Sequence, residues 1–580
     1  MFAWGGLGLP TVGTDPEKER RPPADPTPLD FPVYDIPSIS EDDSESPANR
    51  LYGLLTSIKR PQDITAASLK ALNLKLETDI AVSNIVPEDR MSSLPSLPWE
   101  DAPSAEGEQQ QPEDHPPALM SNGYPYPQKS RYEVVRNELL YDNDDAFREV
   151  VRLSPRPGRQ RIRLTQSRNF WVGLERMSQY WDSSLDNYYE RPASPKQAPA
   201  DQAADKMQTD GQPQEDNKAK EEDRPKTPME LDHPASSSNP SEGPNEGKEC
   251  KEQQEQQQQQ QPEMVTMYTG RRIGSGSEMP DEIRDDAIRG FLEMSAWPFG
   301  CQVSVPSLPP RLAVKNLLFP VRQSFHSGRS PRDRMVARKG VLEGPVLIAQ
   351  CRPDTTFRGP DDAPGSGSGE VCDILREVGA MLLAAEERAR EGKTEVKPGE
   401  GKWWTTTPRW GGAPNDDVGD TAGSNSDEKP VPESGNARKR SKYEHPLMSS
   451  RRSGTSRKLS NAEKWKLIQP GPSLWDKRMV YMQIGKAKES LFDDIYMVSS
   501  INHHVSILHL RVHRRYVELL SSGLSDVPGE SDSVDQPWHV LKLRRTRWLD
   551  LFDGRDRVEA FEGAWRVFHY LMRKDDNGQA

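Results

Sequence analysis

Three histidines near the C-terminal end of the chain are the first candidates for chemistry. In the stretch NHHVSILHLRVH, His503, His509 and His513 lie at even spacing, so a strand would place all three on one face. Imidazole nitrogens are common zinc ligands. However, the chain from His503 to His509 would span roughly 20 Å as a strand, which is too far for one ion. We therefore interpret these histidines as structural residues, and we predict no metal site and no cofactor.

Two adjacent acids, Asp493 and Asp494 in FDDIYM, could bind a metal or act as an acid and a base. Neighbouring strand residues point to opposite faces, so we expect one acid to be exposed and the other to cap a turn. The Gly-rich stretch YTGRRIGSGSEMPDE has no lysine after it, and its acids would repel a phosphate. Because GxSxG and HExxH are also absent from the sequence, we predict a protein that is not an enzyme. An enzyme of unrecognised type remains an alternative.

The four cysteines, Cys250, Cys301, Cys351 and Cys372, are far apart in the sequence. None forms a CxxC pair, and four cysteines in 580 residues are too few for a disulfide-rich scaffold. We expect free thiols in a reducing compartment. The last three lie in apolar or helical surroundings and are predicted to be core residues.

Two arginine-rich stretches are candidates for a binding surface. Residues 148–168 contain seven arginines and one glutamate, followed by Phe170 and Trp171, and residues 542–548 read KLRRTRW. Arginines interleaved with aromatic residues can contact phosphates and stack on bases. The net charge of −13 favours ion pairs within the chain instead. The candidate contacts to nucleic acid or to a partner are Arg159, Arg161, Arg163, Arg168, Arg544, Arg545 and Arg547.

A basic run in an otherwise acidic protein predicts where the protein acts. The stretch RKRSKYEHPLMSSRRSGTSRK, residues 438–458, contains eight Lys or Arg and a single acid. Two basic clusters on a flexible segment are typical of a nuclear import signal, although such a run can also simply offset nearby acids. The residues of the predicted signal are Arg438, Lys439, Arg440, Lys442, Arg451, Arg452, Arg457 and Lys458. We predict that the protein is nuclear.

Apolar residues outside the main folded segments are candidates for docking to a partner. Residues 47–86 show leucines at helical spacing and predict two short helices, which cannot form a core alone. They either dock on the main domain or lie in a partner's groove. The tryptophans of GKWWTTTPRWGG form either a recognition site or a loop packed over the core. The candidate docking residues are Leu51, Leu54, Leu55, Leu69, Leu72, Leu76, Trp403, Trp404 and Trp410.

Folded and unfolded patterns alternate along the chain. Helices are expected in PDEIRDDAIRGFLEMSAW and EVCDILREVGAMLLAAEERAREG, and strands in CQVSV, RLAVKNLLFPV, GPVLIAQCR, RMVYMQIG, DIYMVSS and HHVSILHLRV. Each folded piece is too small to be a domain, so we predict one discontinuous α+β core interrupted by long disordered insertions. The predicted segments are a disordered tail (1–46), a helical docking segment (47–86), a disordered linker (87–128), the first core segment (129–191), a disordered Gln-rich insertion (192–262), the second core segment (263–410), a disordered insertion with the basic signal (411–461) and the third core segment (462–575).

The composition fits a regulatory protein with long disordered regions. Only 33% of the residues are hydrophobic, and there are 52 prolines. No run of eighteen apolar residues occurs, so no membrane span is expected. We expect a non-enzymatic nuclear regulatory or scaffold protein, an accessory subunit of a chromatin or transcription assembly with protein partners. The alternative is a nucleic-acid-binding protein that uses the arginine-rich stretches.

Overall fold

The structure is a computed structural model of the chain. It describes residues 15–36, 47–57, 65–87, 94–100, 118–192, 264–306, 310–315, 317–390, 480–486, 490–528 and 537–574. The predicted import signal and the three tryptophans of GKWWTTTPRWGG lie outside the described residues. The described residues divide into a main unit and a small second unit, to which residues 19–22, 186–192 and 264–269 belong.

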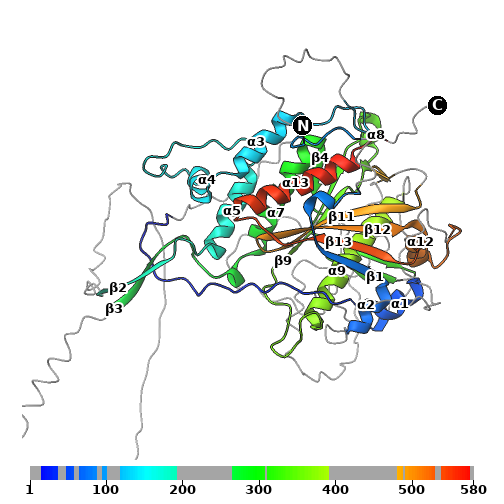
Figure 1. The fold of residues 1–580 in the computed structure, drawn as a ribbon, viewed down its shortest axis with the longest axis horizontal. Coiled ribbons are helices and arrows are strands. Elements are labelled where there is room, and N and C mark those ends of the chain that lie inside the picture. The colour runs from blue at the N-terminus through cyan, green and yellow to red at the C-terminus, as the bar shows by residue number, and fades with distance from the viewer. Residues whose placement is uncertain are drawn as a thin grey trace, which may run out of the picture. The chain divides into compact units, whose positions relative to one another are not determined.

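A mixed ten-stranded sheet organises the main unit (Figure 1), and the predicted α+β class is confirmed. Parallel pairs join β1 to β13, β11 to β9 and β10 to β8, while β11, β12 and β13 are antiparallel neighbours. Along the sheet, the strands are β1 (Leu74–Ile80), β13 (Leu541–Thr546), β12 (His504–His513), β11 (Phe492–Ile501), β9 (Leu347–Arg352), β7 (Phe325–Arg329), β8 (Val341–Glu343) and β10 (Val480–Met482), with β14 (Leu549–Asp550) beside β12 and β4 (Cys301–Ser304) beside β7.

Helices cover both faces of the sheet, and each face has its own hydrophobic core. Successive strand residues alternate between the two cores: Leu347 and Ala349 of β9 belong to one, and Ile348 belongs to the other. The first core is completed by α3 (Lys129–Leu139), α4 (Asn143–Val150), α5 (Arg168–Trp181), α7 (Asp281–Ala296) and α13 (Gly554–Leu571). The second is completed by α1 (Pro47–Ser57), α2 (Ala66–Leu72), α9 (Ser368–Ala389) and α12 (Arg514–Ser522).

Helices α5 and α7 cross at a point where both carry glycine. An ideal Cβ on Gly173 of α5 would lie 2.5 Å from the Cα of Ala287, and one on Gly290 of α7 would lie 2.7 Å from the backbone nitrogen of Phe170. The two backbones are therefore in direct contact, and no side chain separates them.

The segment 47–86 is only partly helical, and the predicted second helix is wrong in its C-terminal half. Helix α2 ends at Leu72, Asn73 has a positive φ of 56°, and residues 74–80 form β1. The leucine spacing is compatible with a helix, but pairing with β13 overrides it. Leu74 then packs into the second core while Leu76 lies against its edge.

The second unit is a two-stranded ribbon. Strand β2 (Asn187–Pro192) pairs antiparallel with β3 (Met264–Thr269), and Arg20 bridges to Tyr268. The predicted boundaries of the first two core segments place these residues in the core, whereas the structure assigns them to a separate unit. Tyr188 and Met264, on one face of the ribbon, are 47% and 52% exposed.

The remaining predicted elements agree with the structure where it describes them. Helices α7 and α9 and strands β4, β9, β10, β11 and β12 form in the predicted stretches, with α9, β11 and β12 extending one or two residues beyond them, and RLAVKNLLFPV forms a hairpin of β5 (Arg311–Val314) and β6 (Leu317–Pro320). A short helix, α8 (Arg334–Arg338), precedes β8. Across the described ranges, none of the helices combines the length and the apolar character needed to cross a membrane.

His569 of α13 gives the fold a measurable pH dependence. Its side chain is 3% exposed and its ring packs 4.7 Å from that of Tyr126. Burial, and then the charge of Arg566, lower its pKa from 6.5 to about 4. The imidazole of His569 is therefore protonated below about pH 6.5 in the unfolded chain, but only below about pH 4 in the folded chain. The stability that neutral His569 contributes is complete above pH 6.5 and is lost as the pH falls toward 4.

We predict that His569→Phe removes this dependence, because phenylalanine fills a similar space and does not titrate. Between pH 7 and pH 4.5, the free energy of unfolding of the wild type should fall by about 2–3 kcal/mol more than that of the variant. Urea unfolding at both pH values measures the difference. Equal pH dependence in the two proteins would show that His569 is not buried in its neutral form.

Candidate functional site

Polar side chains gather at one edge of the central sheet. Strands β9 and β11 are parallel, and β13 runs in the same direction because β12 is antiparallel to both β11 and β13. The carboxyl ends of these three strands therefore meet at one edge. The turn between β11 and β12 lies at the same edge, and so does β14, which pairs with the start of β12. Ligands of open α/β sheets commonly bind at such an edge.

A network of buried charged residues lies beneath this edge, between the sheet and α9. Arg352, the last residue of β9, contacts Asp373 and Ser499, and its Nη2 lies 3.1 Å from Glu377 Oε1. Glu377 Oε2 accepts a 3.2 Å hydrogen bond from Arg545 Nη1. Arg352 and Glu377 are 0% exposed, and Asp373 and Arg545 are nearly as buried. We call Arg352, Asp373, Glu377, Arg545 and Ser499 the ionic cluster.

The charges of the ionic cluster balance. Burial opposes the charged form of both arginines, but the neighbouring groups together more than offset it, Asp373, Glu377 and Tyr34 at Arg352 and Glu377 and Tyr34 at Arg545, so the pKa of each arginine is raised. Two guanidinium groups thus face two carboxylates, and neither arginine can act as a proton acceptor. Ser499 donates its hydroxyl to Glu377 Oε1 over 2.5 Å, but it is also 0% exposed.

The N-terminal region of the chain covers the ionic cluster. We call residues 30–36 the strap. The Tyr34 hydroxyl donates to Asp373 Oδ2 over 2.6 Å, and its ring lies 4.7 Å from the Arg545 guanidinium. Asp30 pairs with Arg358 at 2.6 Å, and the Val33 backbone N–H donates to Glu370 over 2.9 Å. Burial raises the pKa of Tyr34 well above 10, so the hydroxyl remains a hydrogen-bond donor.

Next to the ionic cluster, two histidines and an acid form a second group. His503 and His504 lie at the β11–β12 turn, and the Nε2 atom of each is 3.9 Å from an oxygen of Asp550 on β14. Phe31 of the strap packs edge-on against His504 at 4.8 Å and stacks on Trp548 at 5.5 Å. Burial lowers the pKa of His503 well below 6.5 and that of His504 to about 4, so both imidazoles are neutral at pH 7.

The structure does not place His503, His509 and His513 together on one face of a strand. His503 is in the turn. His509 bonds to Asp494 at 2.9 Å and stacks on Tyr496. His513 accepts the backbone N–H of Arg515 at the start of α12. His509 and His513 thus have structural contacts, as predicted. Among the described residues, the group whose geometry suits a metal ion is His503 with His504 and Asp550.

Asp493 and Asp494 point to opposite faces of β11 as expected, but the prediction that one is exposed is wrong. Both are 8% exposed. Asp493 forms two hydrogen bonds with Arg388 of α9, at 2.8 and 2.9 Å, and Asp494 accepts hydrogen bonds from His509 and Tyr570. Burial favours protonation of Asp494, but His509, Arg511 and Tyr570 together outweigh it and hold the pKa well below its usual value. Helices cover both faces of β11, so both carboxylates are buried and each forms hydrogen bonds with neighbouring side chains.

Acids of the same chain pair with most of the arginines that the sequence singled out. Arg163 is exposed and has no ion pair within the described ranges. The others contact acids in the pairs Arg159–Asp145, Arg161–Glu149, Arg168–Glu149, Arg544–Glu77, Arg545–Glu377 and Arg547–Asp556. Phe170 and Trp171 are 0% exposed in α5, so neither can stack on a base. The residues around them form the helix α5, Arg168–Trp181.

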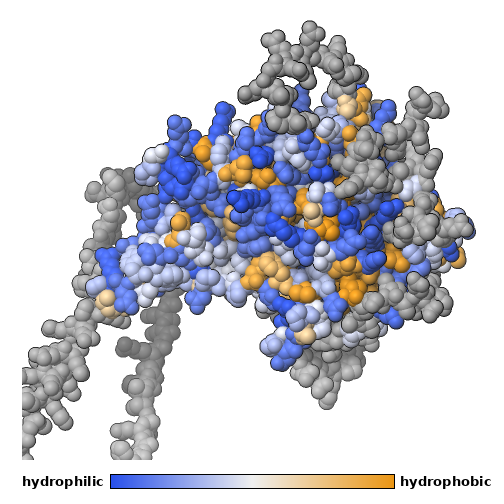
Figure 2. Space-filling view, in the orientation of Figure 1, coloured by the Kyte–Doolittle hydropathy of each residue, from blue (hydrophilic) through white to orange (hydrophobic). Residues whose placement is uncertain are grey.

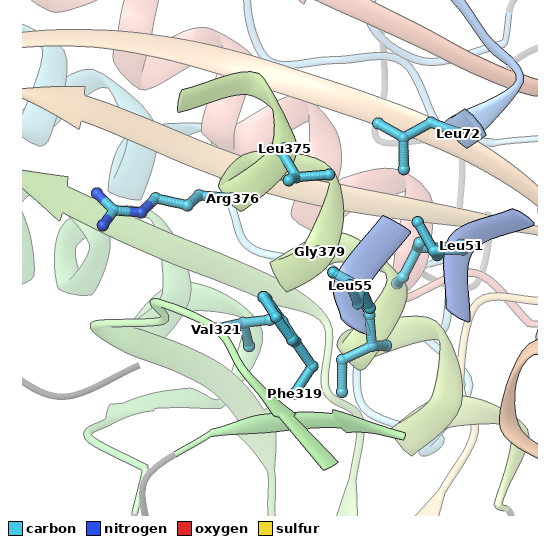
Figure 3. Close-up of a pocket in the computed structure, with 10 residues that line it drawn as sticks. Leu51, Leu55, Leu72, Phe319, Val321, Leu375, Arg376 and Gly379 are labelled. Carbon is cyan, nitrogen blue, oxygen red and sulfur yellow. The ribbon is translucent and has the colours of Figure 1, made fainter. Parts of the chain in front are cut away.

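The candidate docking leucines pack within the chain. Leu51, Leu55, Leu69 and Leu72 are buried in the second core, and Leu54 and Leu76 pack against it. Between α1, α2, α9 and the β5–β6 hairpin they leave a small apolar pocket (Figure 3), whose lining includes Leu51, Leu55, Leu72, Phe319 and Leu375. The guanidinium of Arg376 points away from the leucines. The apolar faces of these helices are thus already covered by their own chain.

Cys301, Cys351 and Cys372 are buried free thiols, as predicted, while Cys250 lies outside the described residues. Burial raises the pKa of Cys301 to about 12 and that of Cys372 to about 11. These thiols are therefore protonated at neutral pH and are not nucleophiles.

Sequence reasoning missed the ionic cluster, although a signal was present. In β9, LIAQCR, the polar Gln350 and Arg352 alternate with apolar residues on a strand that is otherwise hydrophobic. Asp373 and Glu377 then lie four residues apart on the next helix. Comparison of the chain with protein-family models, with curated proteins and with solved structures found no match.

Proposed function

We propose that this chain is a non-enzymatic nuclear regulatory or scaffold protein that serves as an accessory subunit of a chromatin or transcription assembly. The observation that carries the proposal is that the charged groups of the ionic cluster are paired with one another and covered by the strap. At the sheet edge where a catalytic site is most expected, the charged groups neutralise one another, are buried, and lie under the strap.

The chemistry of the ionic cluster argues against catalysis there. A divalent cation such as Mg²⁺ requires several oxygen ligands without competing positive charge. Asp373 and Glu377 each already contact a guanidinium, so a cation would have to displace an arginine. Ser499 and Glu377, which accepts a hydrogen bond from its hydroxyl, are fully buried, so a substrate cannot approach the hydroxyl.

The ribbon supports the protein-binding aspect of the proposal. A two-stranded ribbon has little core of its own, and strand edges in general can pair with another chain. Tyr188 and Met264 are about half exposed on one face of it. By contrast, the face of the main unit seen in Figure 2 is largely hydrophilic, with separate apolar patches. The nuclear aspect of the proposal rests on the basic clusters within residues 438–458.

Affinity purification of the tagged full-length chain from nuclear extract, with and without nuclease, tests the proposal. We expect a stable set of chromatin or transcription proteins that survives nuclease. The variant carrying Tyr188→Asp and Met264→Asp should recover these partners at least about tenfold less well, since each exposed side chain can contribute about 1.5–3 kcal/mol when a partner buries it. The control carries Leu524→Asp and Met335→Asp, which add the same two negative charges at sites that are 79% and 63% exposed in the main unit.

Two outcomes would contradict the proposal. Partners that disappear with nuclease would favour direct nucleic-acid binding, for which steep salt dependence of binding is the signature. Absence of the protein from the nuclear fraction would remove the nuclear assignment, and an enzyme of another kind would then become the leading alternative.

A further inference from the structure

The turn between β11 and β12 brings two consecutive imidazoles to one place. Ile501 pairs with His504, so Asn502 and His503 form a two-residue turn, and Asn502 has a positive φ of 51°. In a straight strand, neighbours such as His503 and His504 would point to opposite faces. The turn removes that alternation, and the two rings lie with their centroids 4.2 Å apart.

Asp550 completes the group from a different region of the chain. Strand β14 pairs antiparallel with β12 so that Asp550 is the direct partner of His504. One ligand atom from each of the three residues lies within 4.8 Å of the others. The Asp550 side chain is 34% exposed and the imidazoles are 12% and 16% exposed, so the group opens to solvent on the Asp550 side.

These contacts do not satisfy the two imidazoles, whereas Asp550 Oδ1 accepts the backbone N–H of Phe552 over 2.8 Å. At 3.9 Å, the distances from Nε2 to the carboxylate exceed a hydrogen bond. The Nδ1 atoms of both histidines are buried and have no hydrogen-bond partner among the residues that the structure describes. An arrangement in which two imidazoles and a carboxylate converge without bonding to one another leaves room for something between them.

We propose that His503, His504 and Asp550 bind one divalent transition-metal ion of the zinc class. Two neutral imidazoles and a carboxylate are the nitrogen and oxygen donors that such ions prefer. Bond lengths of about 2.0–2.2 Å require a modest inward rotation of the three side chains from their present separations. Three protein ligands leave a coordination position for water on the exposed side.

The surroundings support a cation at this position. The imidazoles are held by aromatic rings: Trp181 and Phe552 lie 5.0 and 4.9 Å from His503, and Phe31 lies 4.8 Å from His504. An apolar shell of this kind fixes ring orientation and limits solvent access. A bound ion would connect the β11–β12 turn to β14 and stabilise the ring on which the strap packs.

Titration of the chelator-treated, full-length chain with Co²⁺, followed by competition with Zn²⁺, tests this site. Co²⁺ reports its own coordination through its visible absorption bands. We expect one saturable Co²⁺ equivalent that Zn²⁺ displaces. His504→Ala and Asp550→Asn should each weaken binding about 100-fold or more, because each removes one of three ligands. The matched control, His539→Ala, removes a histidine from another region of the protein and should leave binding unchanged.

Each result decides the proposal. Absence of saturable binding in the wild type up to about 1 mM metal would overturn it, because sites with these ligands bind far more tightly. Binding that survives in the double variant His503→Ala and His504→Ala would place the ion elsewhere. Asp550→Asn nearly preserves the shape of the side chain, so if the histidine variants do not fold, its circular dichroism and metal affinity together still decide.

Discussion

Replacing Glu377 with alanine is expected to lower the free energy of unfolding by about 3–5 kcal/mol, the range for breaking a buried ion pair from one side. Both oxygens of Glu377 are in use, one by Ser499 and Arg352 and the other by Arg545. Without Glu377, two buried guanidinium groups would face Asp373 alone, which leaves an uncompensated positive charge. Urea unfolding measures the change as a shift in midpoint at constant slope.

A second substitution separates charge balance from lost packing. Arg545→Met, added to Glu377→Ala, removes the excess positive charge while retaining much of the side-chain volume. The double variant should therefore lose less stability than the sum of the two single variants, with a coupling of about 1–3 kcal/mol. The surface control is Arg514→Ala, whose partner Glu518 lies one helical turn away and which should change stability by about 0.5 kcal/mol or less. Strict additivity would refute the argument from charge balance.

Replacing Gly290 with valine is expected to destabilise the protein by about 3 kcal/mol or more, through forced separation of α5 and α7. The first side-chain atom at this position would meet the backbone of Phe170 at 2.7 and 2.8 Å, and a backbone cannot rotate away as a side chain can. Phe170 itself is fully buried against Phe291, so a shift of α5 would disturb the centre of the first core. Thermal and urea unfolding both measure the loss.

Gly379 of α9 supplies the matched control for Gly290. It too lies inside a long helix, but an added Cβ would meet a single atom within range, Val321 Cγ1 at 3.2 Å, beside the small apolar pocket. The methyl group of Val321 can move into that pocket. Gly379→Ala should therefore stabilise the protein by up to about 1 kcal/mol, the helix-propensity difference between the two residues. Similar destabilisation at both glycines would show that the close contact between α5 and α7 is not the cause of the stability lost in Gly290→Val.

The sequence predicted helices and strands well where the local hydrophobic periodicity agreed with the tertiary contacts. Helices α7 and α9 and the central strands have clear patterns and appear in the structure as expected. Residues 74–80 show the limit: a helical spacing of leucines became a strand, because the deciding partner, β13, lies at the other end of the chain. No local pattern contains that information.

The candidate sites were harder to predict because they depend on which segments meet. Asp550 and His504 pair only through the β12–β14 register, and Tyr34 reaches Asp373 from 339 residues away. The exposure expected for Asp493 or Asp494 assumed a sheet with an open face, whereas helices cover both faces of β11. The local sequence contained one signal of the ionic cluster, the polar residues Gln350 and Arg352 that alternate with apolar residues in β9.

The pairing of β1 with β13 has a consequence for how the protein is made. Glu77 and Arg544, bonded across these two strands, are 467 residues apart. At translation rates of about 5–20 residues per second, β1 leaves the ribosome about 20–90 s before its partner strand is synthesised. During that time, β1 has no partner strand. We therefore expect the nascent chain to bind chaperones before β13 is made, and a premature stop before residue 541 would release a product in which β1 lacks its partner strand.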